Sequence, residues 1–239
     1  MEKNEMEELI EMKIKELLKN AEKIFFSDSH IPRNNEFFTE WLMKVIDHSK
    51  AKVYGLGDVF ELIECKEDEI RKKGIIEIGL LRKLKQLNRL FLLRGNHDME
   101  SGKVFGLPSY TDSDRDYISV NETTFCILHG HQFDPICKHA WLYKFFRWLI
   151  PYFVTPGKAK YGQKQKIYDI AVKRVLNNAY KANKNLIFGH THWCGIIKRE
   201  SGHVIFQLGD MLDSCTSLII DKEGKFYLLK KWEIIAEWP

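Results

Sequence analysis

The sequence predicts an α/β fold, and three observations support that prediction. In the first half of the chain, short apolar runs alternate with longer stretches of helical pattern. These runs are continuously apolar, which is typical of strands that are covered on both faces. Polar side chains follow the runs directly, where ligands bind in such sheets. We therefore expect a buried sheet with a ligand site beyond the carboxyl ends of its strands.

The first half of the chain supplies the alternation. Helices are expected where apolar residues recur at helical spacing among charged residues, over residues 5–20, 37–48 and 66–88. Strands are expected where short apolar runs end in glycine or polar residues, over residues 23–26, 52–56 and 90–93. This order of elements is that of an α/β domain.

The second half of the chain is rich in strands. Short apolar runs predict strands over residues 123–128, 185–188, 204–208, 217–220 and 226–229. Turns are expected at Gly209-Asp210 and from Asp221 to Gly224. A helical pattern also runs from Ile167 to Ala182.

Length and composition describe an ordinary globular protein. A chain of 239 residues with 44% apolar residues can bury a substantial core. The first residues are acidic and lack the apolar core of a secretory signal. The five cysteines form no Cys-x-x-Cys pair, which favours reduced thiols. No run approaches the roughly 20 apolar residues of a membrane span, so we expect a cytoplasmic protein.

Five of the apolar runs end in side chains that commonly bind metals. In chain order these are Asp28 and His30; Asp58; Asn96, His97 and Asp98; His129; and His190 and His192. Carboxylates, an amide and imidazoles without cysteine suit manganese, iron or zinc better than a structural zinc site. A single histidine is more often a hydrogen-bonded core or surface residue, and an aspartate after a strand is often a helix cap. Together, however, the clusters offer more ligands than one ion needs, which predicts two ions sharing a carboxylate.

The order and spacing of these clusters resemble the calcineurin-like metallophosphoesterases. The motifs of that family stand here as Asp28-Ser29-His30, Gly57-Asp58, Gly95-Asn96-His97-Asp98, His129 and Gly189-His190-Thr191-His192. The resemblance implies one domain over residues 1–239, folded as a two-sheet αββα sandwich with helices outside. It also implies two metal sites bridged by Asp58. One site takes Asp28, His30, Asp58 and His192, and the other takes Asp58, Asn96, His129 and His190.

Two such cations suit the hydrolysis of a phosphoester or pyrophosphate bond. They would neutralise the anionic substrate and generate a metal-bridging hydroxide as the nucleophile. Manganese is the expected metal, with iron or zinc as alternatives. By resemblance, His97 stabilises the transition state or protonates the leaving oxygen, and Asn96, His97 and His190 contact the substrate. Asp98 either orients His97 or is a turn residue. The roles of His131 and Asp210 are left open.

A basic, aromatic segment separates His129 from His190. Between Lys138 and Lys184 there are eleven lysines and arginines against one acid, Asp169, which gives a local net charge of +10. We expect a helical cap over residues 135–183, beside the metal site. Its composition fits a lipid–water interface, which would place the protein peripherally at the inner face of the membrane. It fits equally a cap whose aromatic residues pack inward while its lysines face water.

The sequence also resembles one branch of the family, the UDP-2,3-diacylglucosamine pyrophosphohydrolases. The resemblance lies in Gly57-Asp58-Val59-Phe60-Glu61, in the His-Gly pair at His129 and in the basic cap. It implies a nucleotide-linked lipid, such as UDP-2,3-diacylglucosamine, as the substrate. The chain departs from the branch at His97, at His131 and at Trp193-Cys194, so the broader branch fits better than the named activity.

Two other classes of function remain open. A nuclease or cyclic-nucleotide phosphodiesterase could use the basic segment to follow a phosphate backbone, although no specific nucleic-acid partner is predicted. A metal-free interaction scaffold could use the same fold without catalysis. Such scaffolds usually lose metal ligands, and this sequence keeps a full set.

Overall fold

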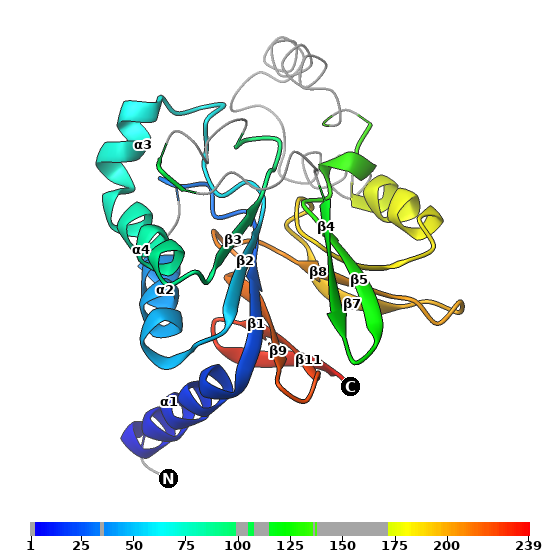
Figure 1. Ribbon diagram of the computed structural model, residues 1–239, viewed down its shortest axis with the longest axis horizontal. Coiled ribbons are helices and arrows are strands. Elements are labelled where there is room, and N and C mark those ends of the chain that lie inside the picture. Colours follow the sequence, from blue (N-terminus) through cyan, green and yellow to red (C-terminus); the bar gives the residue numbers. More distant parts are fainter. Residues whose placement is uncertain (1–2, 34–35, 99–104, 108–114, 136, 138–171) are drawn as a thin grey trace.

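Two mixed sheets lie face to face, and helices cover their outer faces (Figure 1). The computed structural model describes residues 3–33, 36–98, 105–107, 115–135, 137 and 172–239. The α/β prediction and the two-sheet sandwich implied by the resemblance are both confirmed. The single-domain boundaries stay a prediction. Most of the expected cap, residues 135–183, lies outside the described residues.

The first sheet carries three parallel strands at its centre and edge. These are β1 (Ala21–Phe26), β2 (Lys52–Leu56) and β3 (Leu90–Leu93). Three antiparallel strands extend the sheet on the other side of β1: β9 (Thr216–Asp221), β10 (Phe226–Lys230) and β11 (Glu233–Trp238). The spatial order is β11-β10-β9-β1-β2-β3.

The second sheet also combines three parallel strands with antiparallel ones, but its antiparallel strands lie on both sides of the parallel ones. Its parallel strands are β5 (Thr123–Leu128), β6 (Asn185–Phe188) and β8 (Val204–Leu208). Antiparallel strands form its two edges, β4 (Arg115–Val120) and β7 (Cys194–Lys198). The spatial order is β4-β5-β6-β8-β7.

The described helices are α1 (Lys3–Asn20), α2 (Glu36–His48), α3 (Glu67–Lys73), α4 (Ile75–Gln86), the short 3-10 helix η1 (His131–Phe133) and a helix reaching through residues 172–181. The stretch expected as one helix over 66–88 is two helices, divided at Gly74. A β-carbon at Gly74 would overlap the side chain of Ile31, so the chain passes closely there. None of the described helices has the length and apolar character needed to cross a lipid bilayer.

Three apolar clusters hold the layers together. The one between the sheets includes Phe25 and Leu56 from the first sheet and Phe125 and Phe206 from the second. Another packs the first sheet against its helices, and a third packs the second sheet against residues 172–181. The parallel strands are thus covered on both faces, which explains why their sequences do not alternate.

Three strands were not expected from the sequence, namely β4, β7 and β11. All three lie at sheet edges. Every residue of β11 is exposed or partly exposed, and β7 is only partly buried. An edge strand is covered less than a central one, so its sequence carries a weaker apolar signal.

Candidate metal centre

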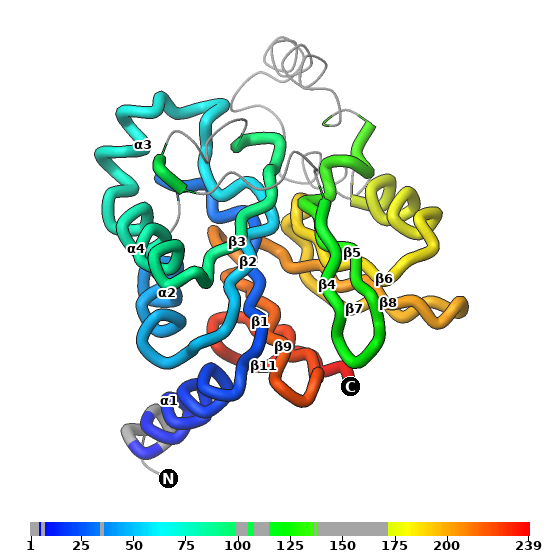
Figure 2. Tube along the Cα trace, in the orientation of Figure 1, coloured from blue at the N-terminus to red at the C-terminus, as the bar shows by residue number. Residues whose placement is uncertain are grey.

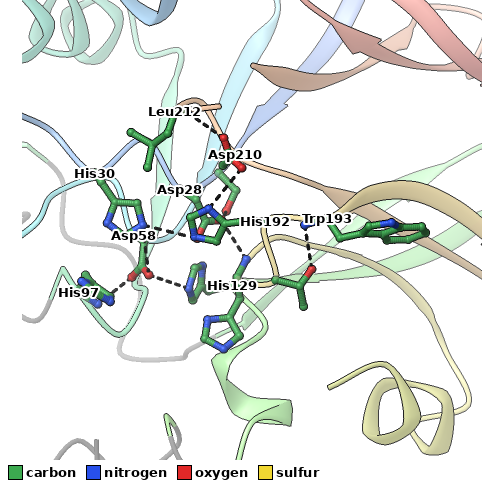
Figure 3. A network of polar contacts seen from close by, with 12 residues as sticks. Asp28, His30, Asp58, His97, His129, His192, Trp193, Asp210 and Leu212 are labelled. Carbon is green, nitrogen blue, oxygen red and sulfur yellow. Dashed lines mark hydrogen bonds and ion pairs between the residues drawn. The ribbon is translucent and has the colours of Figure 1, made fainter. Parts of the chain in front are cut away.

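The loops that follow the parallel strands of both sheets bring their polar side chains together (Figure 3). The chain path in Figure 2 shows how segments far apart in sequence reach one side of the sandwich. Parallel strands end at the same edge of a sheet, so the residues after them become neighbours. The acidic residues and histidines that Figure 3 labels in these loops are Asp28, His30, Asp58, His97, His129, His192 and Asp210.

Asp28 has one oxygen fixed by the protein and one turned toward imidazoles. Its Oδ2 accepts hydrogen bonds from the hydroxyl of Ser27 and from the amide of His190, the latter at 2.9 Å. Its Oδ1 lies 3.5 Å from Nε2 of His192 and 3.9 Å from Nε2 of His30. These separations are too long for good hydrogen bonds, but they suit atoms that share one cation.

Asp58 occupies the middle of the cluster. Its Oδ1 accepts a hydrogen bond from the amide of His97 at 2.7 Å. Its Oδ2 lies 3.2 Å from Nε2 of His129 and 3.9 Å from Nε2 of His30. One carboxylate therefore faces histidines of both sheets, since His30 follows β1 and His129 follows β5.

Five side chains of this cluster sit on a left-handed backbone. The φ angles are 53° at Asp28, 45° at His30, 50° at Asp58, 66° at His190 and 55° at His192. Such conformations cost up to about 1–3 kcal/mol each and collect at functional sites. Backbone hydrogen bonds hold two of them: the amide of Asp28 donates to Gly57 at 3.1 Å, and that of His30 donates to Asp58 at 2.9 Å.

Two glycines let the loops approach this closely. A β-carbon on Gly95 would overlap the carboxylate and backbone nitrogen of Asp58. A β-carbon on Gly189 would overlap the hydroxyl of Ser27 and the carboxylate of Asp28. These two glycines are therefore required by contact between loops.

The side chains present fit a pair of divalent cations. Within the described residues, four buried ligand-type atoms of the cluster make no hydrogen bond: Asp28 Oδ1, His30 Nε2, Asn96 Oδ1 and His129 Nε2. Buried polar atoms are costly when unpaired, and each of these is a common metal ligand. Ligand atoms also gather within 4.8 Å of one another in several groups of described residues; the first group is Asp28 with His30 and His192, and the second group is Asp58 with His129 and His190.

In the first group, each histidine has its own carboxylate partner at Nδ1, the ring nitrogen that does not face Asp28. His30 Nδ1 lies 3.0 Å from Glu61 Oε2, and His192 Nδ1 lies 3.3 Å from Asp210 Oδ2. Asp210 is itself fixed, because its Oδ1 accepts the amides of residues 212, 213 and 214. Such partners fix the ring orientation of a metal-binding histidine and increase its basicity.

The second group is supported differently. His129 Nδ1 donates to the backbone carbonyl of Leu56 at 2.8 Å, which leaves Nε2 facing Asp58. His190 Nε2 lies 3.6 Å from Asp134 Oδ2, beyond hydrogen-bond range. In the second group, His129 therefore has a neutral partner and His190 has only a long contact with a carboxylate. In the first group, both histidines have a close carboxylate.

The buried carboxylates make the cluster attractive to cations. Burial alone would lower the pKa of His129, but Asp58 and Asp28 raise it to about 10. Burial alone would likewise lower the pKa of His192, but Asp28 outweighs this effect and raises the pKa to about 9. The pKa of Asp58 falls well below its usual range, because His129 outweighs burial. In the absence of metal, protons therefore occupy positions that cations would take.

His97 and Asp98 do not pair in the way that one reading of the sequence offered. His97 Nδ1 lies 2.8 Å from Glu61 Oε1, so the carboxylate that orients this ring is Glu61. The oxygens of Asp98 accept backbone amides, from Phe60 at 2.7 Å and from Gly95 at 2.9 Å. Burial, followed by nearby Asp58, raises the pKa of Asp98 to about 6. The structure thus shows Asp98 as the residue that ties the loop after β3 to the loop after β2.

Glu61 links two histidines at once. It is 2% exposed, and its two oxygens contact His30 and His97 separately. Burial would raise its pKa, but hydrogen bonds with these histidines lower it to about 2. His131, whose role the sequence left open, begins η1 with its ring centroid 5.5 Å from that of His129.

Sequence reasoning assigned no role to Glu61, Asp134 or Asp210. A signal for Asp210 was present, because it follows the apolar run of β8 just as the other site residues follow theirs. Glu61 is three residues beyond Asp58, within a motif already noted. Asp134 had no such marker, because it comes after a turn beyond β5 rather than at the end of the strand.

Comparisons with known proteins agree with this geometry. A family model described as calcineurin-like phosphoesterase matches residues 24–194. Two curated proteins named UDP-2,3-diacylglucosamine hydrolase, both from Shewanella sp., are similar. The one from strain ANA-3 is 26% identical over 242 residues, and the one from strain MR-7 is 25% identical over 239 residues. Each alignment covers 84% of this chain and 94% of the relative.

A solved structure shares the fold. Yfce, a phosphoesterase from E. coli, superposes with a TM-score of 0.53 at 17% sequence identity, covering 90% of this chain and 97% of that protein. The family match spans well over half of the chain and contains all five sequence motifs. The chain therefore belongs to the calcineurin-like phosphoesterase family and is a metal-dependent phosphoesterase with histidine and aspartate metal-binding clusters.

Proposed function

We propose that the protein hydrolyses a phosphoester or pyrophosphate bond with two divalent cations that share Asp58. The observation that carries this proposal is the position of Asp58, whose Oδ2 faces His129 of one group and His30 of the other. The unpaired ligand atoms around it support the same arrangement. When bound, the two cations would activate water and neutralise charge on the phosphate.

The proposed ligand sets follow the two groups. One cation would be held by Asp28, His30, Asp58 and His192, and the other by Asp58, Asn96, His129 and His190. Oxygen and imidazole donors suit manganese, with iron or zinc as alternatives. Asp28 can turn only Oδ1 toward a cation, because Oδ2 is already occupied by two hydrogen bonds.

His97 is the proposed proton donor to the leaving oxygen. Its amide is anchored on Asp58, and its Nδ1 is held by Glu61, so the ring is fixed beside the metal groups. Its ring centroid lies 4.8 Å from that of His30. Asn96 and His190 are proposed to contact the phosphate together with His97. Asp98 would act by keeping the loop in place.

The proposed substrate is a nucleotide-linked lipid of the UDP-2,3-diacylglucosamine type. The name of the Shewanella relatives and the motif ending in Glu61 support this class. The basic, aromatic segment over residues 138–184 would receive the anionic and acyl parts. In this proposal, the same segment brings the protein to the membrane surface that carries the substrate.

A matched pair of substrates tests the proposal. The manganese-loaded protein should cleave UDP-2,3-diacylglucosamine. It should cleave UDP-N-acetylglucosamine, which lacks the two long acyl chains, at least about tenfold less efficiently. Equal efficiency for the two compounds would show that the protein does not recognise the acyl chains, and would contradict a lipid substrate. No cleavage of either compound or of a chromogenic phosphodiester, with manganese, iron or zinc, would contradict the proposed hydrolysis.

A nucleic-acid substrate is the second candidate, favoured by the local charge of +10. A protein that follows a phosphate backbone should lose affinity steeply as salt increases. Cleavage of single-stranded DNA or of a cyclic nucleotide, with strong salt dependence for DNA and no requirement for an acyl chain, would favour this candidate over the lipid.

A further inference from the structure

A further group of ligand atoms lies beside the proposed metal pair. Asp134, Cys137 and His190 each offer one ligand atom, and these atoms lie within 4.8 Å of one another. Asp134 is 7% exposed, and Cys137 and His190 are partly buried. Asp134 and Cys137 lie just beyond η1, whereas His190 comes from the loop after β6. The group thus joins two loops that are distant in sequence, and it contains a thiol, unlike the other groups.

The distance within this group is that of two ligands of one metal ion. His190 Nε2 and Asp134 Oδ2 are 3.6 Å apart, which is too long for a hydrogen bond. Nitrogen and oxygen atoms bound to a tetrahedral zinc at about 2.0–2.2 Å lie about 3.3–3.6 Å apart. The carboxylate and the imidazole are therefore already spaced for a cation between them.

We propose that Asp134, Cys137 and His190 form a third metal site that takes a thiophilic divalent cation such as zinc. The thiolate distinguishes it from the proposed pair, whose donors are oxygen and imidazole, because sulfur ligands favour softer metals. Water would complete a tetrahedral coordination. This inference goes beyond the proposed hydrolysis and does not require a particular phosphoester substrate.

His190 couples this site to the metal pair. It also belongs to the group with Asp58 and His129. A neutral imidazole has one free nitrogen lone pair, so it serves one cation at a time. Zinc at the third site should therefore withdraw His190 from the manganese pair and lower turnover.

The rival account of the same contacts is hydrogen bonding alone. Burial, with Asp134 nearby, raises the pKa of the Cys137 thiol, which as a neutral group would donate to that carboxylate. Asp134 would then only orient its neighbours. The two accounts differ in one observable, a bond between sulfur and metal.

Cobalt reports that bond directly, because thiolate ligands give Co²⁺ an intense charge-transfer absorption in the near ultraviolet. The metal-free protein should develop this band as Co²⁺ is added beyond two equivalents. The band should persist in Cys194→Ser, a matched thiol change at the start of β7, and should be lost in Cys137→Ser. Absence of the band from the wild-type protein, or equal intensity in Cys137→Ser, would overturn the proposal.

A second measurement needs no variant. Alkylation of the native protein with excess iodoacetamide at alkaline pH, followed over time by peptide mass spectrometry, should modify Cys137 more slowly after zinc is added than in the manganese-loaded protein. Modification that is unchanged by zinc would count against the site. Neither readout depends on turnover, so loss of the third site and failure of the proposed hydrolysis can be told apart.

Discussion

The two sides of Asp58 are built from similar residues but are supported differently. On the Asp28 side (Asp28, His30 and His192), both histidines are held by close carboxylates, Glu61 and Asp210. On the His129 side (Asn96, His129 and His190), one histidine is held by a backbone carbonyl, and the other faces Asp134 only at 3.6 Å. A carboxylate partner makes an imidazole a better ligand. The Asp28 side should therefore bind its cation more tightly, and the His129 side should lose its cation first.

The substitution Asp58→Asn should weaken cation binding on both sides, because both sides share this carboxylate. We expect turnover to fall on the order of 10⁴-fold and both cations to bind more weakly, because a shared anionic ligand becomes a neutral amide. Turnover and metal content after dialysis would measure this. Asp47→Asn, an exposed change in α2, is the matched control. Retention of both metals by Asp58→Asn would show that the carboxylate does not bridge them.

His97→Ala should separate chemistry from metal binding. We expect kcat to fall by about 10²-fold or more while metal content is unchanged, because His97 is assigned as a proton donor and not as a ligand. The pH profile of kcat should also lose its basic limb. A loss of one metal from His97→Ala would instead place this residue in the ligand set, where it lies beside His30 and Asp58.

Asp210→Asn and Asp134→Asn form a pair that sharpens the comparison. Asp210→Asn should weaken manganese binding on the Asp28 side by about 10- to 100-fold, since His192 loses its orienting carboxylate. Asp134→Asn should change manganese binding less, because its contact with His190 is too long for a hydrogen bond. Titration of each metal-free variant with manganese, followed by electron paramagnetic resonance, would measure both effects. A larger effect from Asp134→Asn would reverse the proposed order of the two sides.

The smallest effect concerns the pH dependence of the metal-free protein. The pKa values of about 10 for His129 and about 9 for His192 lie above the ordinary 6.5. Their charged forms therefore stabilise the fold fully below about pH 6.5, and this contribution is lost as pH rises through about 9 to 10. Tm should fall over that range by a few degrees more in the metal-free wild type than in metal-free Asp58→Asn. Identical profiles would show that His129 does not pair with Asp58.

Much of the fold could be predicted from the sequence because its parallel strands are largely buried. The apolar run at residues 90–93 predicted β3, and the run at 185–188 predicted β6, with the bounds that the structure shows. The edge strands β4, β7 and β11 were not predicted, because a partly buried strand has no continuous apolar run. Burial by neighbours, rather than intrinsic preference, decides where the sequence signal is strong.

The same reasoning explains which parts of the metal centre were accessible. Side chains that directly follow a strand could be placed, because strand ends of one sheet meet in space. The partners of those side chains could not be placed, because they depend on how separate loops pack. Glu61 reaches both His30 and His97 only because the loops after β1, β2 and β3 are joined by contacts such as that of Asp98 with Phe60.

The measurement that tests the central claim most directly is anomalous diffraction from crystals soaked in manganese. The account predicts two manganese peaks about 3.5–4 Å apart, with Asp58 between them and the stronger peak on the Asp28 side at limiting manganese. A single peak, or two peaks that do not share Asp58, would contradict it.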